Sequence, residues 1–403
     1  MEDLMMLKKT IVILGVLFFI SAALVSHSSG AENFTWPKYF RISTPPVGTA
    51  NHSLASAWSA AFSGATKVRA RVLPAPNGYS RCEWLTTGQA EISLVQASDY
   101  IERIDGFEGF ASRTAGPADT RVFYISLVTP WGGMLRGDSK IKTIYDIGPD
   151  TKVVWYRGSS FIMTGMRALL ATRGFTPEDV KTVEVGSYGA NSKVIAEGRA
   201  DITYTSPISD LNYEVAANPK GVRWLNIPSA SEDPKAFKAY RNLQAGYAIA
   251  PAKAGHKSAH GIRMSQAYQN WHVKGNEDEE TVYQLVKWLD ENHNLYKDKY
   301  VHGKLMIIEN LVEFLDNDPV EPIHPGTIKY LKEKGLWKDK YAKQNEFNLA
   351  LSKKYIDGYQ AALKEADTKG IKVIPDNEKW VDLWKQYKKD NGLAMSYGLV
   401  ERP

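Results

Sequence analysis

Hydrophobic and polar positions along the chain follow two alternating patterns. Short segments rich in Val, Ile, Tyr and Phe alternate with segments whose apolar residues recur at helical spacing. In the first part of the chain, strands are predicted at 39–43, 68–73 and 92–95. Between them, a helix capped by Asn51 or Ser53 is predicted to end near Phe62, and a second helix covers 80–87. This order is typical of an α/β fold with a largely parallel sheet.

The same order begins again in the middle of the chain. After a strand at 123–128 and a short helix at 141–147, the pattern predicts strands 153–156, 182–185 and 202–205 and helices 163–172 and 192–197. A further strand at 244–249 is predicted to return the chain to the first lobe. Crossings near 128–133 and 227–246 therefore predict a hinge of two strands.

A short motif occurs once in each half. The residues at 88–92, Gly-Gln-Ala-Glu-Ile, are echoed by Gly-Arg-Ala-Asp-Ile at 198–202. Each copy follows a predicted helix and precedes a predicted strand, which indicates two lobes of similar build. Glu91 and Asp201 could be a carboxylate pair, but each comes just after a helix-ending glycine. We interpret them as turn-forming or helix-facing groups.

These patterns divide the chain into five segments. The predicted segments are a signal peptide (1–31), a first lobe (32–128, with 246–337), a second lobe (129–245) and a helical C-terminal extension (338–403). The extension is strongly charged but carries an amphipathic stripe that includes Trp380 and Trp384, so we expect its helices to pack against the body.

The N-terminus indicates export. Two lysines precede the apolar segment 10–25, and small residues follow up to Ala31, which is the layout of a signal peptide cleaved near Ala31. An uncleaved anchor helix is the alternative. Cys82, the one cysteine, can form no internal disulfide and lies too far from the signal to carry a lipid anchor. We expect a periplasmic protein.

Composition excludes two further classes of protein. Of the 403 residues, 43% are hydrophobic and 24% are charged, which is typical of globular chains and not of disordered ones. The net charge is +5, from 50 basic and 45 acidic residues, without a block of Lys and Arg. We therefore expect no nucleic-acid partner.

Four loops in which a strand leads into a helix carry the candidate chemistry. They cover 44–53, 76–81, 157–161 and 188–192, and each places Gly, Ser, Thr or Asn at a helix N-terminus. Unpaired first-turn N–H groups and the helix dipole favour anions there. Arg157 could bind a carboxylate through two hydrogen bonds. The alternatives are ordinary capping loops and a surface Arg157 paired with a local acid.

The sequence offers little for catalysis. No Gly-x-Ser-x-Gly motif surrounds Ser206, no histidine pair has metal-binding spacing, and no cysteine pair is present. We therefore expect no catalytic residue, no metal site and no cofactor.

Several short motifs together resemble the TAXI branch of TRAP-transporter solute receptors. They are Thr-Gly-Gln-Ala-Glu-Ile at 87–92 with Gln96, the segment 140–147, the second motif copy at 198–202, and Ile-His-Pro-Gly at 323–326. The resemblance covers about 39–335. It implies that the loop with Gly48 and Thr49 holds a ligand carboxylate, and that 77–80 and 158–159 are further ligand loops.

The chain also departs from this family. Ala50 and Asn51 stand where the family has a tyrosine pair, Pro45 and Pro46 replace glycines, and the segment beyond Lys338 has no family counterpart. These departures concern the identity of the ligand more than the binding role.

Loops and resemblance together give the expected function. The resemblance implies a two-lobed periplasmic-binding-protein fold, here an α/β chain with a two-strand hinge. Such a protein would act as a monomer that captures a small organic anion, which we expect to be a carboxylate, and delivers it to TRAP-type integral membrane permease subunits. An exported α/β enzyme that uses Arg157 and His52, or a structural surface protein, are the alternatives. The candidate ligand-binding residues are Thr44, Gly48, Thr49, Asn51, His52, Asn77, Gly78, Tyr79, Ser80, Gln96, Arg157, Gly158, Ser159, Ser160 and Ser206.

Overall fold

The computed structural model describes residues 34–403, of which 37–403 form one compact unit. The predicted signal peptide lies outside the described residues. The strands are β1 (Tyr39–Thr44), β2 (Arg69–Pro74), β3 (Ile92–Leu94), β4 (Thr120–Arg136), β5 (Lys152–Trp155), β6 (Lys181–Glu184), β7 (Thr203–Thr205), β8 (Val222–Trp224), β9 (Ala248–Pro251) and β10 (Arg263–Lys274).

The helices alternate with these strands through the first two thirds of the unit and then follow one another. They are α2 (Ala50–Thr66), α3 (Gly78–Thr87), α4 (Ala97–Asp105), α5 (Ser160–Ala171), α6 (Tyr188–Ala196), α7 (Asp210–Ala216), α8 (Pro234–Leu243), α9 (Glu279–Glu291), α10 (Glu309–Asp316), α11 (Pro325–Glu333), α12 (Asp339–Thr368) and α13 (Glu378–Asp390). In the part of the chain that the structure describes, none of these helices is long and apolar enough to cross a membrane.

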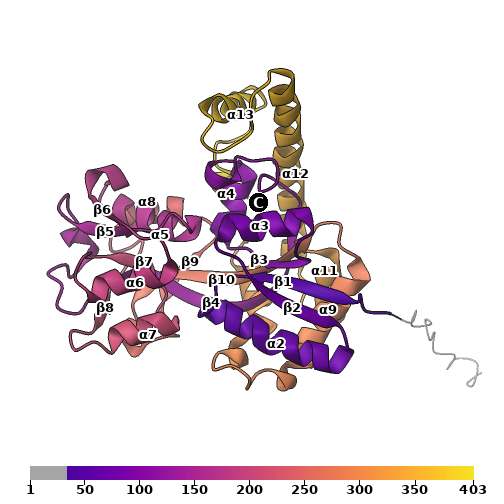
Figure 1. The fold of residues 1–403 in the computed structure, drawn as a ribbon, viewed down its shortest axis with the longest axis horizontal. Helices are drawn as coiled ribbons and strands as arrows, with labels where there is room; N and C mark the ends of the chain where they lie inside the picture. Colours follow the sequence, from indigo (N-terminus) through magenta and orange to yellow (C-terminus); the bar gives the residue numbers. More distant parts are fainter. Residues whose placement is uncertain (1–33) are drawn as a thin grey trace, which may run out of the picture. The chain divides into compact units, whose positions relative to one another are not determined.

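Two long strands, β4 and β10, connect the lobes. The main sheet has the order β2-β1-β3-β10-β4-β7, with β8 beside β4 and β9 beside β10. β1 pairs in parallel with β2 and β3, whereas β4 and β10 run antiparallel to each other along most of their length (Figure 1). One end of this pair continues the sheet of the first lobe, and the other end carries β7, β8 and β9 of the second. This confirms the two-lobed α/β fold.

The second crossing lies later in the chain than predicted. It is made by β10, and the predicted strand at 244–249 begins only at Ala248, because Gln244 still forms the C-terminal cap of α8. The apolar pattern missed β10 because that strand carries polar residues, among them Gln269, Asn270 and His272, that are fully buried in the sheet. A neighbouring side chain accepts a hydrogen bond from each amide NH₂ group, Thr129 from Gln269 and Glu321 from Asn270.

Helix starts also differ from the predicted ones. The cap of α2 is Thr49, whose hydroxyl accepts a hydrogen bond from the N–H of His52 at 3.3 Å, and not Asn51 or Ser53. In α3, Asn77 Oδ1 accepts from the N–H of Ser80 at 2.8 Å. The short helix predicted at 141–147 is a single 3₁₀ turn, Ile144–Asp146. Helix α4, which follows Gln96, was not predicted at all.

The repeated motif has the same structural role in both lobes. Gly88 and Gly198 both adopt positive φ, at 74° and 71°. A carboxylate oxygen of Glu91 accepts from the N–H of Arg41 at 2.7 Å, and one of Asp201 accepts from the N–H of Lys152 at 2.8 Å. In each lobe the acidic side chain therefore binds the backbone of a neighbouring strand. The role is structural, but the carboxylate faces a strand and not the turn or helix that we expected.

The C-terminal extension is helical and packs against the first lobe. Tyr355 of α12 and Tyr397 near the C-terminus share a buried cluster with Tyr100 of α4. The indole N–H of Trp384 in α13 donates to the carbonyl oxygen of Asp105 at the end of α4, at 2.7 Å. Helix α4 is therefore held by the extension. The exact boundaries between the lobes stay a prediction.

Candidate functional site

A cavity of about 100 Å³ lies where both lobes meet the connecting strands. Three loops of the first lobe, the two connecting strands and three loops of the second lobe line it. In that order the lining residues are Pro45, Pro46, Thr49, Ala50, Asn51, Pro76, Asn77, Gly78, Arg81 and Gln96; Thr129, Trp131 and Gln269; and Tyr156, Gly158, Ser159, Phe161, Ile162, Tyr188, Ser206, Ile208 and Ser209.

Ser209, the cap of the seven-residue helix α7, lines this cavity. Four longer helices of the described part of the chain also begin at it. Their N-terminal caps are Thr49 of α2, Asn77 of α3, Gln96 of α4 and Ser159 of α5, and all four residues line it. First-turn N–H groups lack intrahelical partners, and the helix dipole adds partial positive charge at the same place. Because helices of both lobes begin here, an anion in the cavity would interact favourably with both lobes.

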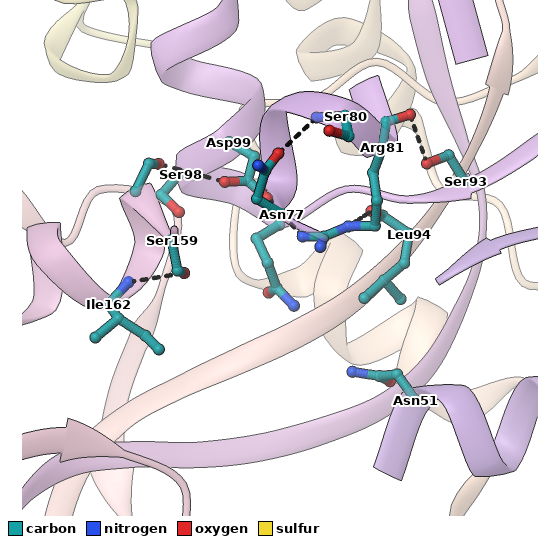
Figure 2. Close-up of polar contacts among 12 residues, drawn as sticks. Asn51, Asn77, Ser80, Arg81, Ser93, Leu94, Ser98, Asp99, Ser159 and Ile162 are labelled. Carbon is teal, nitrogen blue, oxygen red and sulfur yellow. Dashed lines mark hydrogen bonds and ion pairs between the residues drawn. The ribbon is translucent and has the colours of Figure 1, made fainter. Parts of the chain in front are cut away.

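Arg81 is the charged residue among the described residues that line the cavity. It lies in the second turn of α3 and is 7% exposed. Its Nε donates to the carbonyl oxygen of Leu94 at 2.8 Å, and Nη2 donates to Asp99 Oδ2 at 3.1 Å (Figure 2). Its Nη1 makes no hydrogen bond with the residues that the structure describes, so this nitrogen can still donate to a ligand anion.

Asp99 connects Arg81 to the second lobe. Its carboxylate lies so close to Gly78 that a Cβ there would come within 2.7 Å of Oδ1, which explains the glycine. Oδ1 accepts from the hydroxyl of Ser160, the first residue of α5, at 3.3 Å. Burial raises the pKa of Asp99, and the charge of Arg81 opposes this shift. One turn later, Glu102 accepts from Thr164 of α5 at 3.0 Å, so α4 and α5 form a polar contact between the lobes.

Three side-chain amides form the floor of the cavity. Gln269 of β10 accepts at Oε1 from Asn51 Nδ2 and from Gln96 Nε2, both at 2.6 Å. Its own Nε2 donates to Thr129 Oγ1 at 2.7 Å. This network joins α2, α4 and both connecting strands at one point.

Aromatic side chains form the wall on the side of the second lobe. Trp131 and Phe161 meet edge to face, with ring centroids 4.7 Å apart, and Trp131 also contacts Tyr188. The indole N–H of Trp131 donates to Thr129 Oγ1 at 2.8 Å, which fixes the ring. Such a wall suits an apolar or planar ligand body.

Eight of the fifteen predicted residues line this cavity: Thr49, Asn51, Asn77, Gly78, Gln96, Gly158, Ser159 and Ser206. The other seven do not: Thr44, Gly48, His52, Tyr79, Ser80, Arg157 and Ser160.

Most of these seven are close neighbours with structural contacts. Thr44 Oγ1 and His52 Nδ1 lie 3.0 Å apart, and burial lowers the pKa of His52. Tyr79 packs on Phe110 with ring centroids 4.7 Å apart. The N–H of Ser80 donates a hydrogen bond to the cap residue Asn77, and the hydroxyl of Ser160 donates to Asp99. Gly48 lies in the turn before α2 and has a φ of 86°.

Arg157 does not have the environment that the sequence suggested. Its side chain is 71% exposed, and Nη2 pairs with Glu184 Oε1 at 2.7 Å. It borders an open depression outside the cavity, together with Arg167 and Phe175. The alternative of a surface arginine paired with a local acid is therefore the observed one.

Arg81 and Gln269 are two residues of the cavity lining that were not among the predicted ligand-binding residues. Arg81 belongs to one of the four loops singled out, at 76–81, so a signal for it existed. Gln269 belongs to β10, which the apolar pattern did not identify as a strand. Among the described residues, no group of three or more His, Cys, Asp or Glu side chains could hold a metal ion.

Several solved structures are similar to this chain at low identity. The periplasmic aliphatic sulphonate-binding protein SsuA from Escherichia coli matches over 87% of this chain and 100% of its own, with 14% identity and a TM-score of 0.41. The periplasmic binding protein BugD matches over 75% of this chain and 100% of its own, with 11% identity and a TM-score of 0.47.

A third example is the amino acid ABC transporter substrate-binding protein AbpA from Streptococcus pneumoniae, solved with L-arginine. It matches over 67% of this chain and 96% of its own, with 13% identity and a TM-score of 0.39. No curated protein sequence matches the chain. The match to a family model covers most of the chain, from residue 42 to residue 335. The chain belongs to the NMT1-like family.

Proposed function

We propose that the protein is an exported solute receptor that captures a small organic anion between its lobes. The observation that carries this proposal is the meeting of four helix N-termini and the free Nη1 of Arg81 at one cavity lined by both lobes. A carboxylate is the simplest ligand group for such a site. Because contacts from both lobes exist only when the cleft is closed, ligand binding would favour the closed state.

The receptor would act in the periplasm as a monomer and deliver its solute to a membrane permease. The predicted signal peptide supports export. A TRAP-type permease is the partner implied by the resemblance of the motifs at 87–92 and 198–202 to TAXI receptors. Co-purification of the tagged receptor with membrane proteins, followed by their identification by mass spectrometry, would test this partner. Recovery of an ABC-type permease instead would contradict it.

The two residues proposed for an enzyme do not lie at the cavity. The enzyme alternative relied on Arg157 and His52, and neither lines the cavity. The helix caps, by contrast, are suited to holding an anion without making or breaking a bond. We therefore favour binding without turnover.

One experiment tests the receptor directly. The purified mature protein is denatured, any released small molecule is identified by mass spectrometry, and the refolded protein is titrated with that molecule and with a panel of carboxylates. A ligand at a hundredfold excess over its Kd should add about 2.7 kcal/mol to the free energy of unfolding. Absence of any released molecule, together with no response to the panel, would refute the proposal. Conversion of the ligand into a product would favour the enzyme.

A further inference from the structure

The orientation of the Gln269 amide is fixed by its surroundings. Its Nε2 lies 3.3 Å from the carbonyl oxygen of Ala267, which can only accept. The hydroxyl of Thr129 donates its single hydrogen to that same carbonyl at 3.1 Å, so Thr129 Oγ1 can only accept from Gln269 and from Trp131. These contacts place the amide nitrogen of Gln269 toward Thr129 and its oxygen toward Asn51 and Gln96.

This orientation determines the two neighbouring amides. Because Gln269 Oε1 is an acceptor, Asn51 and Gln96 must each turn their NH₂ group toward it. Their carbonyl oxygens then take no part in the hydrogen bonds of this network. Asn51 Oδ1 and Gln96 Oε1 are buried and have no hydrogen-bond partner among the described residues.

An unpaired buried oxygen of this kind is costly. A buried acceptor without a partner costs about 1–3 kcal/mol. Gln96 is only 6% exposed, and it lines the cavity. Two such acceptors at one place are readily explained if a bound molecule supplies the missing donor.

We propose that the ligand carries a neutral hydrogen-bond donor, a hydroxyl or an amide N–H, which Asn51 Oδ1 and Gln96 Oε1 recognise. This inference rests on the proposed function and narrows its ligand class to hydroxy- or amido-substituted organic anions. A protonated amine fits less well, because no Asp or Glu is among the described residues that line the cavity. Figure 2 shows Asn51 set apart from Asn77 and Arg81.

Matched pairs of probes that differ by one donor test the inference. Lactate is compared with propionate, 3-phenyllactate with 3-phenylpropionate, and N-acetylglycine with N-acetylsarcosine, whose methyl group removes the amide N–H. Isothermal titration calorimetry gives the Kd ratio within each pair, and the molecule released on denaturation is identified in parallel. We expect the donor-bearing member of a bound pair to bind at least about tenfold more tightly.

Variants assign this preference to the two oxygens. Gln96→Met should reduce the Kd ratio within each bound pair to near 1. Asn51→Ala should have the same effect, and because alanine is a good helix former in α2, this variant can be used if Gln96→Met does not fold. Gln89→Met is the matched control, because Gln89 is exposed and lies outside the cavity, and it should leave the ratio unchanged.

The experiments distinguish failure of the hydrogen-bond donor from failure of the receptor function. Equal affinities within the bound pairs, an unchanged ratio in Gln96→Met and Asn51→Ala, or a released ligand without any O–H or N–H donor would overturn the inference and leave the receptor intact. No binding of any probe, together with no released ligand, would overturn both.

Discussion

Replacing Arg81 with methionine tests whether the buried pair with Asp99 stabilises the folded protein. The substitution keeps an unbranched side chain but removes the donors to Leu94 and Asp99. Asp99 is 1% exposed, and it would keep only the hydroxyl of Ser160 as its side-chain partner. Removing one member of a buried ion pair typically costs about 3–5 kcal/mol, because the other charge stays buried without compensation.

We therefore expect Arg81→Met to lower the free energy of unfolding by about 3–5 kcal/mol in the ligand-free protein. Without the charge of Arg81, the pKa of Asp99 should rise further above its usual range. Adding Asp99→Asn should recover much of the loss, since a neutral amide costs less to bury than an unpaired carboxylate.

Urea unfolding of the wild type, both single variants and the double variant gives the coupling energy, provided that the m-values agree. Arg113→Met is the control, because Arg113 pairs with Asp367 on the exposed surface and should change stability little. A loss below about 1 kcal/mol for Arg81→Met, or strictly additive losses in the double variant, would refute the argument from burial.

Three further predictions concern other charges. Burial raises the pKa of Glu102 to about 7, so the folded protein holds a proton there that the unfolded chain releases, and stability should fall as pH rises from about 4.5 to about 7. Glu102→Gln should reduce this pH-dependent loss in the free energy of unfolding by up to about 3 kcal/mol, measured by urea titrations between pH 4.5 and pH 7. The prediction is contradicted if the variant and the wild type show the same dependence of stability on pH. Lys388 is fully buried, and its Nζ lies 3.5 Å from Asp105 Oδ1. Lys388→Met should therefore lower the free energy of unfolding by about 3 kcal/mol in urea titrations. A loss near zero would mean that this ion pair does not hold the extension on α4. Arg157→Ala should leave ligand affinity unchanged in calorimetry, because Arg157 pairs with Glu184 outside the cavity, and a tenfold loss would return it to the site.

Local patterns predicted much of the fold because they report local requirements. Strands β1 and β2 and helix α3 were predicted to within two residues, since alternation and helical spacing depend on neighbours in the sequence. Helix α4 was missed because its sequence is mostly polar, and the contacts that stabilise it come from the distant helices α5 and α12. Tertiary packing, not local pattern, decides such an element.

The candidate site was predicted in part for the same reason. Asn77 and Ser159 were found because capping residues have a local signature, and a cap at the end of a strand also lies at the ligand edge of an α/β sheet. Thr49 was found through its loop, although the caps predicted there were Asn51 and Ser53. Arg157 lies outside the cavity and pairs on the surface with Glu184, which is 27 residues away in the sequence. The residues next to Arg157 in the sequence do not distinguish an arginine that binds a ligand carboxylate from one in a surface ion pair.

The sequence by itself determined the α/β alternation, the duplicated motif and the gathering of capping residues in a few loops, because each depends on residues close together in the chain. Only the tertiary structure decided which charge and which amides meet at the cavity. Gln269 contacts Asn51 across 218 positions of the chain, and Gln96 across 173. The orientation of those three amides follows from one backbone carbonyl, that of Ala267, which only the pairing of β10 with β4 brings beside Thr129.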